Sequence, residues 1–452
     1  MIFKSINPYT QQTIAEYPIL SNSQLNLKLE KSQQAFKSWR ETSFSQRAEI
    51  VLKAGEILRR DKEKFANLIT SEMGKIINES RAEIEKSAAN CDYYAHNSDK
   101  ILKDLPVEMG LYKSVISYNP IGTVFAIMPW NYPFWQVFRY AAPCIMAGNT
   151  TILKHAPNVL GCGKAIEQIF LEAGLPEGIF QSVEVDIPQV EQIIAHDTVQ
   201  LVTLTGSEKA GSSVASLAGK HIKKSIMELG GSDAFIIFND ADLEKAAQVA
   251  TTSRMMNAGQ ACICAKRFIV LDEIADAFLQ KFSSKISFLK QGNPLDENSN
   301  MGPLARLDLA NNLSQQLRTS LKQGGILKVG GEQELCNFKP SLLDNISPTN
   351  IVFQEETFGP LATVIRAKNE QEAIDLANNH RYGLAASIWT KDLEKAYHFA
   401  QKIESGNVFV NSLVRSDSRL PFGGIKKSGY GRELGELGIK ELCNNKSIVI
   451  EE

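Results

Sequence analysis

The residue best suited to chemistry is Cys262, which ends the segment Asn-Ala-Gly-Gln-Ala-Cys at residues 257–262. A cysteine that follows a glycine-containing turn can lie at an exposed site dense in backbone amides, where its thiolate attacks an electrophile. Most free cysteines are instead small buried hydrophobic residues. The hexapeptide alone leaves both interpretations open.

Two other polar side chains could assist such a nucleophile. Glu228 ends an apolar run and is followed by Gly230 and Gly231. It is therefore either a desolvated base with a raised pKa or a solvated charge at a strand end. Asn131 lies between the two prolines of residues 129–133, Pro-Trp-Asn-Tyr-Pro. Its amide can be directed at a developing oxyanion, or the residue simply forms a turn.

A possible anion-binding segment is Thr-Gly-Ser-Glu-Lys-Ala-Gly at residues 205–211, which follows a predicted strand and begins a predicted helix. Free N–H groups and the helix dipole at that point can bind a pyrophosphate. The segment is not a Walker A loop, because Ser212 and Ser213 follow Gly211, and it is not G-x-G-x-x-G. An ordinary helix N-cap is the alternative.

These residues need elements to position them, and the sequence pattern predicts an α/β protein. Early periodicity favours helices over 27–39, 46–61 and 64–97, and residues 111–127 favour strands. Short apolar runs then alternate with amphipathic segments, as in βαβ units with parallel sheets, and a boundary near Gly230 separates two α/β domains. The alternating elements are strands over 150–154, 200–204, 225–228, 234–238, 267–271, 362–366 and 386–389, and helices over 163–173, 208–218, 370–378 and 392–403.

The composition is that of an ordinary globular protein: 452 residues, 43% hydrophobic and 22% charged. The net charge of −2 gives no global field for nucleic acid or an anionic membrane. No secretory signal is visible, and apolar stretches such as 124–130 are shorter than the roughly 20 residues that span a bilayer. Seven cysteines without a C-x-x-C or H-E-x-x-H motif predict reduced thiols, a cytoplasmic location and no metal site.

The order of short motifs along nearly the whole chain resembles the aldehyde dehydrogenase superfamily. Each motif is weak alone, but their order and spacing together are specific. The motifs are Pro-Trp-Asn at 129–131, Leu-Lys at 153–154, Gly-Ser-x-x-x-Gly at 206–211, Glu-Leu-Gly-Gly at 228–231, Gly-Gln-x-Cys at 259–262, Glu-Thr-Phe-Gly-Pro at 356–360 and Pro-Phe-Gly-Gly at 421–424.

The resemblance implies a fold with three parts. A Rossmann-type cofactor domain is expected from residues 1–97 and 123–230, and an α/β catalytic domain from residues 231–426. A small β oligomerisation element, from residues 98–122 and 427–452, would build a homodimer or homotetramer. The run Ser-Ile-Val-Ile in the tail also reads as an exposed strand, which invites pairing with another chain.

The resemblance also assigns catalytic roles. Cys262 would attack an aldehyde to give a thiohemiacetal, whose oxyanion is held by the Asn131 amide and the Cys262 backbone N–H. Oxidation leaves a thioester, and Glu228 would activate the water that hydrolyses it to the carboxylic acid. Aldehyde dehydrogenases that acylate coenzyme A lack this glutamate, so that alternative is the weaker one.

For the cofactor, the resemblance implies NAD or NADP. Many NAD-preferring members carry a glutamate where this chain has Pro157, so nothing here repels a 2′-phosphate. Either cofactor is therefore open. The implied contacts are Lys154 at the adenosine ribose, Gly206, Ser207 and Gly211 at the pyrophosphate, Glu356 at the nicotinamide ribose, and Trp130 and Phe358 along the nicotinamide channel.

Within the superfamily the chain most resembles succinate-semialdehyde dehydrogenases, which implies succinate semialdehyde or a neighbour such as glutarate semialdehyde as substrate. Arg139 would bind the substrate carboxylate, as a planar guanidinium does well. A second arginine of other members is replaced by Met256. The further substrate-binding residues expected are Trp135, Phe422 and members of the loop 412–420, namely Arg415, Ser416, Ser418 and Arg419.

Cys264 lies two residues after Cys262. It could capture a sulfenic acid formed on a low-pKa Cys262 and so act as a redox partner, through a strained and easily reduced disulfide. The alternative is a small buried residue that points away from the site.

Overall fold

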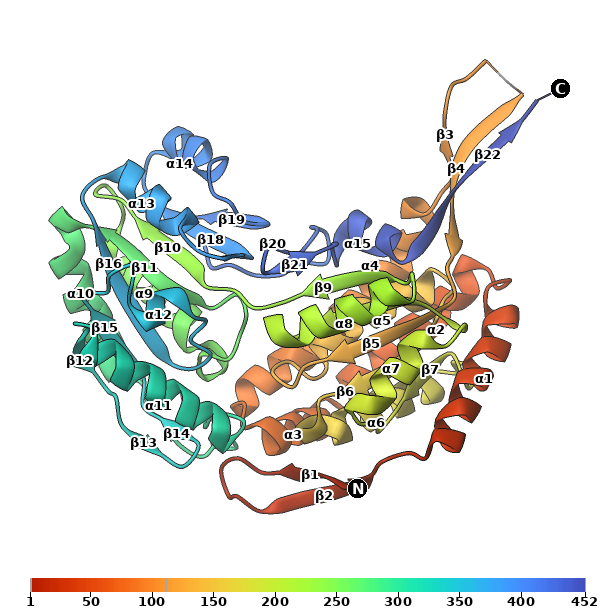
Figure 1. Cartoon of the computed structure of the whole chain (residues 1–452), viewed down its shortest axis with the longest axis horizontal. Helices are drawn as coiled ribbons and strands as arrows, with labels where there is room; N and C mark the ends of the chain where they lie inside the picture. The colour runs from red at the N-terminus through yellow and green to blue at the C-terminus, as the bar shows by residue number, and fades with distance from the viewer. Residues whose placement is uncertain (1, 111, 452) are drawn as a thin grey trace.

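The computed structural model describes residues 2–110 and 112–451, and it contains two large sheets, each covered by helices (Figure 1). The first sheet has six strands in the order β21-β9-β8-β5-β6-β7, all parallel except β21. Its strands are buried on both faces, as parallel sheets usually are. They are β5 (Thr123–Met128), β6 (Thr150–His155), β7 (Phe180–Ser182), β8 (Val199–Thr205), β9 (Lys224–Glu228) and β21 (Gly429–Tyr430).

The second sheet has seven strands in the order β12-β15-β16-β11-β10-β18-β19, with only β12 antiparallel. The chain crosses from the first sheet to the second between Glu228 and Asp233, which is where the Gly230–Gly231 pair lies. Its strands are β10 (Asp233–Ile237), β11 (Ala265–Leu271), β12 (Ile326–Val329), β15 (Ser341–Asp344), β16 (Leu361–Ala367), β18 (Ala385–Trp389) and β19 (Asn407–Val410).

Helices pack on both sheets. In the first half, capping boxes at Ser21, Ser43 and Asp186 set three helix starts, because each side chain accepts from the N–H three residues later. The helices are α1 (Asn22–Trp39), α2 (Phe44–Arg60), α3 (Lys62–Met73), α4 (Ile77–Ile101), α5 (Trp135–Met146), α6 (Leu160–Glu172), α7 (Ile187–Ala195), α8 (Glu208–Lys220), α9 (Leu243–Met255), α10 (Asp272–Ser287), α11 (Leu307–Lys322), α12 (Ile351–Gln354), α13 (Glu370–Asn378), α14 (Leu393–Ala400) and α15 (Gly435–Glu441), with 3₁₀ turns η1 (Pro157–Val159) and η2 (Met256–Gly259).

The α/β class is confirmed, but two expectations about helices are wrong. The single helix predicted over 64–97 is two helices, because Gly74 takes a left-handed conformation (φ 79°) and caps α3. Helix α5 was missed, because all its residues are buried and its polar residues Gln136 and Arg139 do not form a solvent-facing side. This missed helix carries Arg139 and Trp135.

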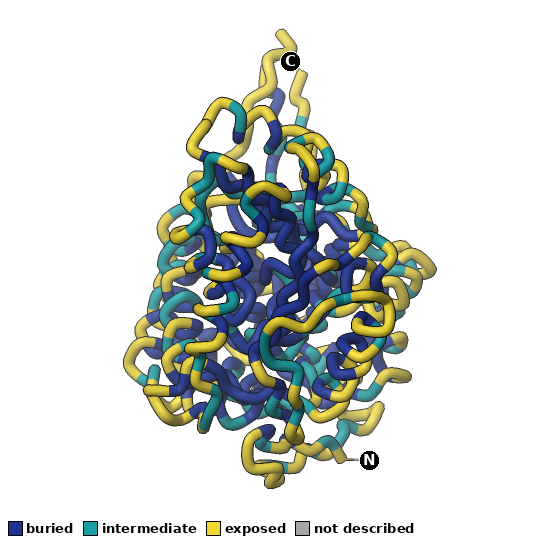
Figure 2. Tube along the Cα trace, turned by 90° about the vertical axis from the view of Figure 1, so that its left-hand side faces the viewer, coloured by how far each residue is buried: buried dark blue, intermediate teal, exposed yellow. Residues whose placement is uncertain are grey.

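A three-stranded arm projects from the body and ends at the C-terminus (Figure 1). Strand β22 (Cys443–Ile450) pairs with β4 (Lys113–Pro120), which pairs with β3 (Leu105–Pro106). Figure 2 shows that the tip of the arm is exposed whereas the body has a buried interior. The predicted element 427–452 begins too early, because β21 pairs with β9 and α15 packs against α5. The remaining short strands are β1 (Ile2–Ile6), β2 (Thr13–Pro18), β13 (Gln333–Glu334), β14 (Asn337–Phe338), β17 (Tyr382–Gly383) and β20 (Ile425–Lys426).

Candidate active site

Cys262 lies in the loop between η2 and strand β11. Asn257, Ala258 and Gly259 before it all have positive φ, of 52°, 52° and 72°. A Cβ at position 259 would overlap the carbonyl of Gly359, so this tight turn requires glycine. The turn leaves Cys262 half-buried, on the lining of a large cavity.

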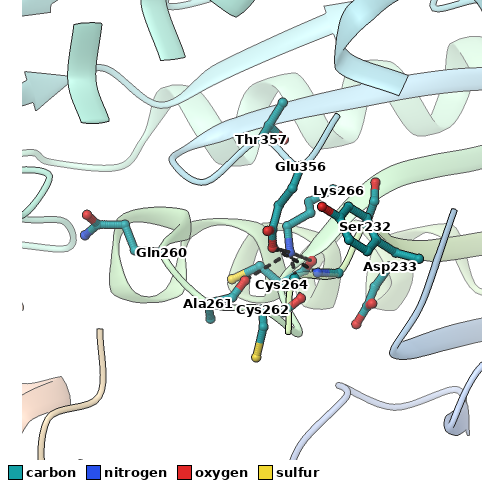
Figure 3. Close-up of polar contacts among 12 residues, drawn as sticks. Ser232, Asp233, Gln260, Ala261, Cys262, Cys264, Lys266, Glu356 and Thr357 are labelled. Atoms are coloured by element: carbon teal, nitrogen blue, oxygen red, sulfur yellow. Dashed lines mark hydrogen bonds and ion pairs between the residues drawn. The ribbon is translucent and has the colours of Figure 1, made fainter. Parts of the chain in front are cut away.

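The ammonium of Lys266 is joined to this loop by several hydrogen bonds (Figure 3). Its Nζ donates to the carbonyl oxygens of Ala261 at 3.0 Å, Cys262 at 2.7 Å and Cys264 at 3.2 Å. It also lies 3.4 Å from Oε1 of Glu356, and the lysine side chain is fully buried. One buried cation therefore links the nucleophile loop to a carboxylate expected at the cofactor.

The surroundings of Cys262 favour the neutral thiol over the thiolate. Burial raises its pKa to about 12, and the nearby carboxylates Glu356 and Asp233 act in the same direction. The positive charges of Arg139 and Lys266 oppose the rise. Nucleophilic attack therefore needs a base or a charge rearrangement that removes the thiol proton.

Asn131 is anchored to the same loop. Its Nδ2 donates to the carbonyl of Gln260 at 3.0 Å, and Nδ2 of Asn257 donates to the Asn131 carbonyl at 2.8 Å. The residue is buried. Because a side-chain amide has two N–H donors, this hydrogen bond engages only one of them.

Glu228 ends strand β9 with a buried carboxyl group. Within the described residues its Oε1 has no hydrogen-bond partner. Burial raises its pKa well above the usual range, and the negative charge of Glu433 raises it further, whereas Arg139 and Arg432 oppose the shift. Glu228 is thus a buried carboxyl group with basic character, although it does not line the large cavity that holds Cys262.

Arg139 has a charged partner within the protein. Its guanidinium forms a buried ion pair with Glu433, and its Nη2 donates to Oγ1 of Thr205 at 3.1 Å. The two charged side chains are only 2% and 4% exposed. Arg139 lines the cavity, over the ring of Phe422, but its charge is already neutralised within the protein.

The cavity beside Cys262 has a volume of about 540 Å³. It brings together Cys262 and five of the seven side chains expected to bind substrate, and Met256 lies on its wall as well. Of the remaining loop candidates, Arg415 lines it, Arg419 pairs with Asp417, and Ser418 donates to Asn90. The five on the lining are Trp135, Arg139, Arg415, Ser416 and Phe422.

Sequence reasoning missed Lys86, which also lines this cavity. Its Nζ donates to Oγ of Ser416 at 2.8 Å and lies 4.2 Å from the centre of the Trp135 ring. Lys86 looks like one of many exposed lysines in the helical pattern of α4. Lys86 could be recognised only from the side of α4 that packs against Trp135. That side is known only once α5 is placed.

The predicted pyrophosphate residues begin helix α8. Ser207 is exposed and its Oγ accepts from the N–H of Ala210 at 3.3 Å, and Gly206 is half-buried beside it. Gly211 has a different role, because it is buried and a Cβ there would overlap the Leu229 side chain. The close packing of α8 against Leu229, just after β9, therefore explains why residue 211 is a glycine.

The other predicted cofactor residues lie on nearby loops. Trp130 and Phe358 contact each other edge to face, with ring centres 5.7 Å apart. Oε1 of Glu356 accepts from the N–H of Gly231 at 3.1 Å. Lys154 lies near the end of β6 and is half-buried. Burial lowers the pKa of its ammonium group. Trp130 and Lys154 lie at the carboxyl ends of β5 and β6, the edge of a parallel sheet where dinucleotides bind in such folds.

Arg254, which sequence reasoning also missed, fixes the loop that carries Glu356. This buried guanidinium donates to the carbonyls of Thr357 at 2.7 Å and Leu361 at 2.9 Å, and to that of Gly359. Arg254 lies two residues before Met256, which occupies the position of the second arginine of other family members. The arginine therefore positions backbone rather than substrate.

Cys264 is fully buried, and its Sγ donates to the carbonyl of Met256 at 3.7 Å. Burial raises the pKa of its thiol. The side chains of Cys262 and Cys264 point in different directions (Figure 3), and both are free thiols. This geometry fits the packing alternative.

Comparison with known protein families assigns the chain to one of them. The family model described as "Aldehyde dehydrogenase family" matches residues 1–448, and the chain belongs to this family. No group of three or more potential ligands among the described side chains could hold a metal ion. Likewise, no helix in the described ranges is long and apolar enough to cross a membrane.

Individual relatives are similar over their full length. A succinate semialdehyde dehydrogenase [NAD(P)+] of Escherichia coli K12 is 44% identical over 98% of this chain and 97% of the relative. A probable succinate-semialdehyde dehydrogenase [NADP(+)] of Synechocystis is 43% identical over all of both chains. The crystal structure of succinic semialdehyde dehydrogenase from Streptococcus pyogenes with NADP+ superposes with a TM-score of 0.98, at 36% identity and full coverage of both chains.

Proposed function

We propose that this aldehyde dehydrogenase oxidises succinate semialdehyde to succinate with NADP+ or NAD+. The observation that carries the proposal is the cavity beside Cys262, whose largely apolar lining includes cationic side chains and the hydroxyl of Ser416. A short aldehyde with a carboxylate at its far end matches that lining. The names of the two curated relatives support the same substrate and cofactors.

In the proposed reaction, Cys262 transfers its thiol proton to solvent water at the cavity, and its sulfur adds to the aldehyde carbon. The second N–H of the Asn131 amide and the backbone N–H of Cys262 donate to the resulting oxyanion of the thiohemiacetal. Departure of hydride from that carbon leaves a thioester on Cys262. Water then adds, Glu228 takes a proton from it, and succinate leaves as the thiol re-forms. The raised pKa of Glu228 suits a general base.

A nicotinamide dinucleotide supplies the hydride acceptor when it is bound. The residues present fit this group: the exposed start of α8 at Gly206 and Ser207 suits a pyrophosphate, and Glu356 has a carboxylate suited to ribose hydroxyls. Trp130 and Phe358 provide an aromatic wall. Pro157 begins the turn η1 where a carboxylate would exclude a 2′-phosphate, so both cofactors are accepted.

The proposal includes assembly through the projecting arm. Leu105, Val107 and Met109 on one side of the arm, and Val449 and Ile450 on the other, are exposed. Strand β22 pairs only with β4 and is an edge strand. Another copy of the chain would cover these groups in a homodimer or homotetramer. The seven free cysteines support a cytoplasmic location.

The direct test is a panel of succinate semialdehyde, glutarate semialdehyde and butyraldehyde, each with NAD+ and NADP+, followed by absorbance of the reduced cofactor. We expect the highest kcat/KM for succinate semialdehyde and turnover with both cofactors. Equal kcat/KM for butyraldehyde would contradict the proposed substrate. Size-exclusion chromatography with light scattering tests the assembly, and a monomer would contradict it.

A further inference from the structure

The acidic side chains that line the cavity are all engaged by other groups. Each has a hydrogen-bond donor or a cation of its own, and within the described residues none of them forms an ion pair with Lys86 or Arg139. These pairs are Glu79 with the N–H of Asn257, Glu83 with Lys75, and Glu297 with Arg81.

Two half-buried or buried cations face the cavity, and their situations are opposite. Arg139 is neutralised by Glu433. Lys86 has no ion-pair partner among the described residues, and its Nζ contacts only the Ser416 hydroxyl and the face of Trp135. The ammonium of Lys86 is therefore the cation left for a ligand.

The surroundings of Lys86 penalise its positive charge. Burial lowers its pKa to about 8, and the positive charge of Arg139 acts in the same direction. The charges of Glu83, Asp417 and Cys262 oppose the shift. However, Glu83 already pairs with Lys75 and Asp417 with Arg419. A carboxylate brought in by a ligand would compensate the remaining charge.

We infer that Lys86 and Ser416 together form the subsite that receives the carboxylate of the substrate, with Arg139 as a structural neighbour. This inference rests on the proposed function, because it takes the substrate to be a semialdehyde acid. Oγ of Ser416 accepts from Lys86, so its own hydrogen is free to donate to the carboxylate. Arg415 also lines the cavity, but it is exposed, and water weakens its attraction for an anion.

The test compares Lys86→Met and Lys86→Arg with wild type, using the ratio of kcat/KM for succinate semialdehyde to that for butyraldehyde. Loss of a hydrogen bond to a charged group is expected to lower this ratio by about ten- to a hundredfold in Lys86→Met. Lys86→Arg keeps the charge and retains most of the ratio. Lys164→Met is a matched control, because Lys164 also lies over an aromatic ring, that of Tyr17, but is not part of the cavity lining.

Wild-type enzyme provides a second test that requires no substitution. A substrate carboxylate stays ionised from pH 6 to pH 10, whereas Lys86 with a pKa of about 8 loses its proton as the pH rises. The ratio should therefore fall above about pH 8 in wild type and stay level in Lys86→Arg. Ionisations of Cys262 and Glu228 affect both aldehydes and cancel in the ratio.

The outcomes separate this inference from the proposed function. A wild-type enzyme that prefers succinate semialdehyde, with an unchanged ratio in Lys86→Met and no pH dependence, overturns the role of Lys86 and leaves the proposed function standing. A wild-type enzyme without that preference overturns both.

Discussion

The cation in the loop that carries Cys262 and the cation on the cavity wall differ in the partners that the protein gives them. In the loop, Lys266 has three backbone carbonyls and the Glu356 carboxylate as partners. In the wall, Lys86 has one hydroxyl and one aromatic face.

The difference distinguishes positioning from recognition. A buried charge whose partners all come from the protein holds those partners in one geometry. A charge that lacks a counter-charge favours a ligand that brings one. Arg139, paired with Glu433, belongs with Lys266 in the first group even though it lies on the cavity wall.

The largest effect is expected at the loop itself. Cys262→Ala removes the nucleophile and should reduce turnover of every aldehyde to below a few per cent of wild type. Cofactor binding, measured by fluorescence titration, and thermal unfolding should be unchanged. Substantial remaining turnover would show that another group attacks the aldehyde.

Glu228→Gln should separate the two halves of the reaction. The thioester still forms, so a rapid-mixing experiment should show one burst of reduced cofactor per active site. Slow turnover then follows, because no base activates the water. Steady turnover at the wild-type rate would mean that a different group performs this step.

Arg139→Leu should act through the fold rather than through substrate choice. It leaves Glu433 buried without its cation, and the loss of one partner of such a pair costs about 3–5 kcal/mol of unfolding free energy. Urea denaturation measures this loss, and the double variant Arg139→Leu/Glu433→Leu should recover part of it. A fully stable Arg139→Leu that loses only succinate semialdehyde activity would restore Arg139 as the carboxylate ligand.

The smallest effect is expected at Cys264. Its thiol is buried and bonds to the Met256 carbonyl, so it is a poor partner for an oxidised Cys262. After peroxide and then dithiothreitol, Cys264→Ala and wild type should recover the same fraction of activity. Poorer recovery in the variant would establish the redox role.

The sequence was most informative where chemistry depends on a short stretch of chain. Cys262, Glu228 and Asn131 could be proposed as site residues because each lies in a short motif of the family, and the strand–helix alternation predicted the two parallel sheets. Helix α5 was missed because it is buried along its whole length, so its few polar residues do not face solvent.

The charge pairs could not be predicted, because they join distant segments. Glu433 pairs with Arg139, although the two residues are nearly three hundred positions apart in the chain. Ser416 and Lys86 are hydrogen-bonded and lie 330 positions apart. Only the packing of α4, α5 and the C-terminal loops brings them together. The sequence therefore identified Arg139 by its chemical type, whereas the structure shows that its charge is already used.

The most direct test of this contrast compares Lys266→Met with Lys86→Met in one assay of both aldehydes. Lys266→Met should lower kcat for succinate semialdehyde and butyraldehyde by a similar factor, about tenfold or more, because it loosens the loop that carries Cys262. Lys86→Met should instead lower the ratio of their kcat/KM values. A selective loss of succinate semialdehyde activity in Lys266→Met, or an equal loss of both activities in Lys86→Met, would contradict the account.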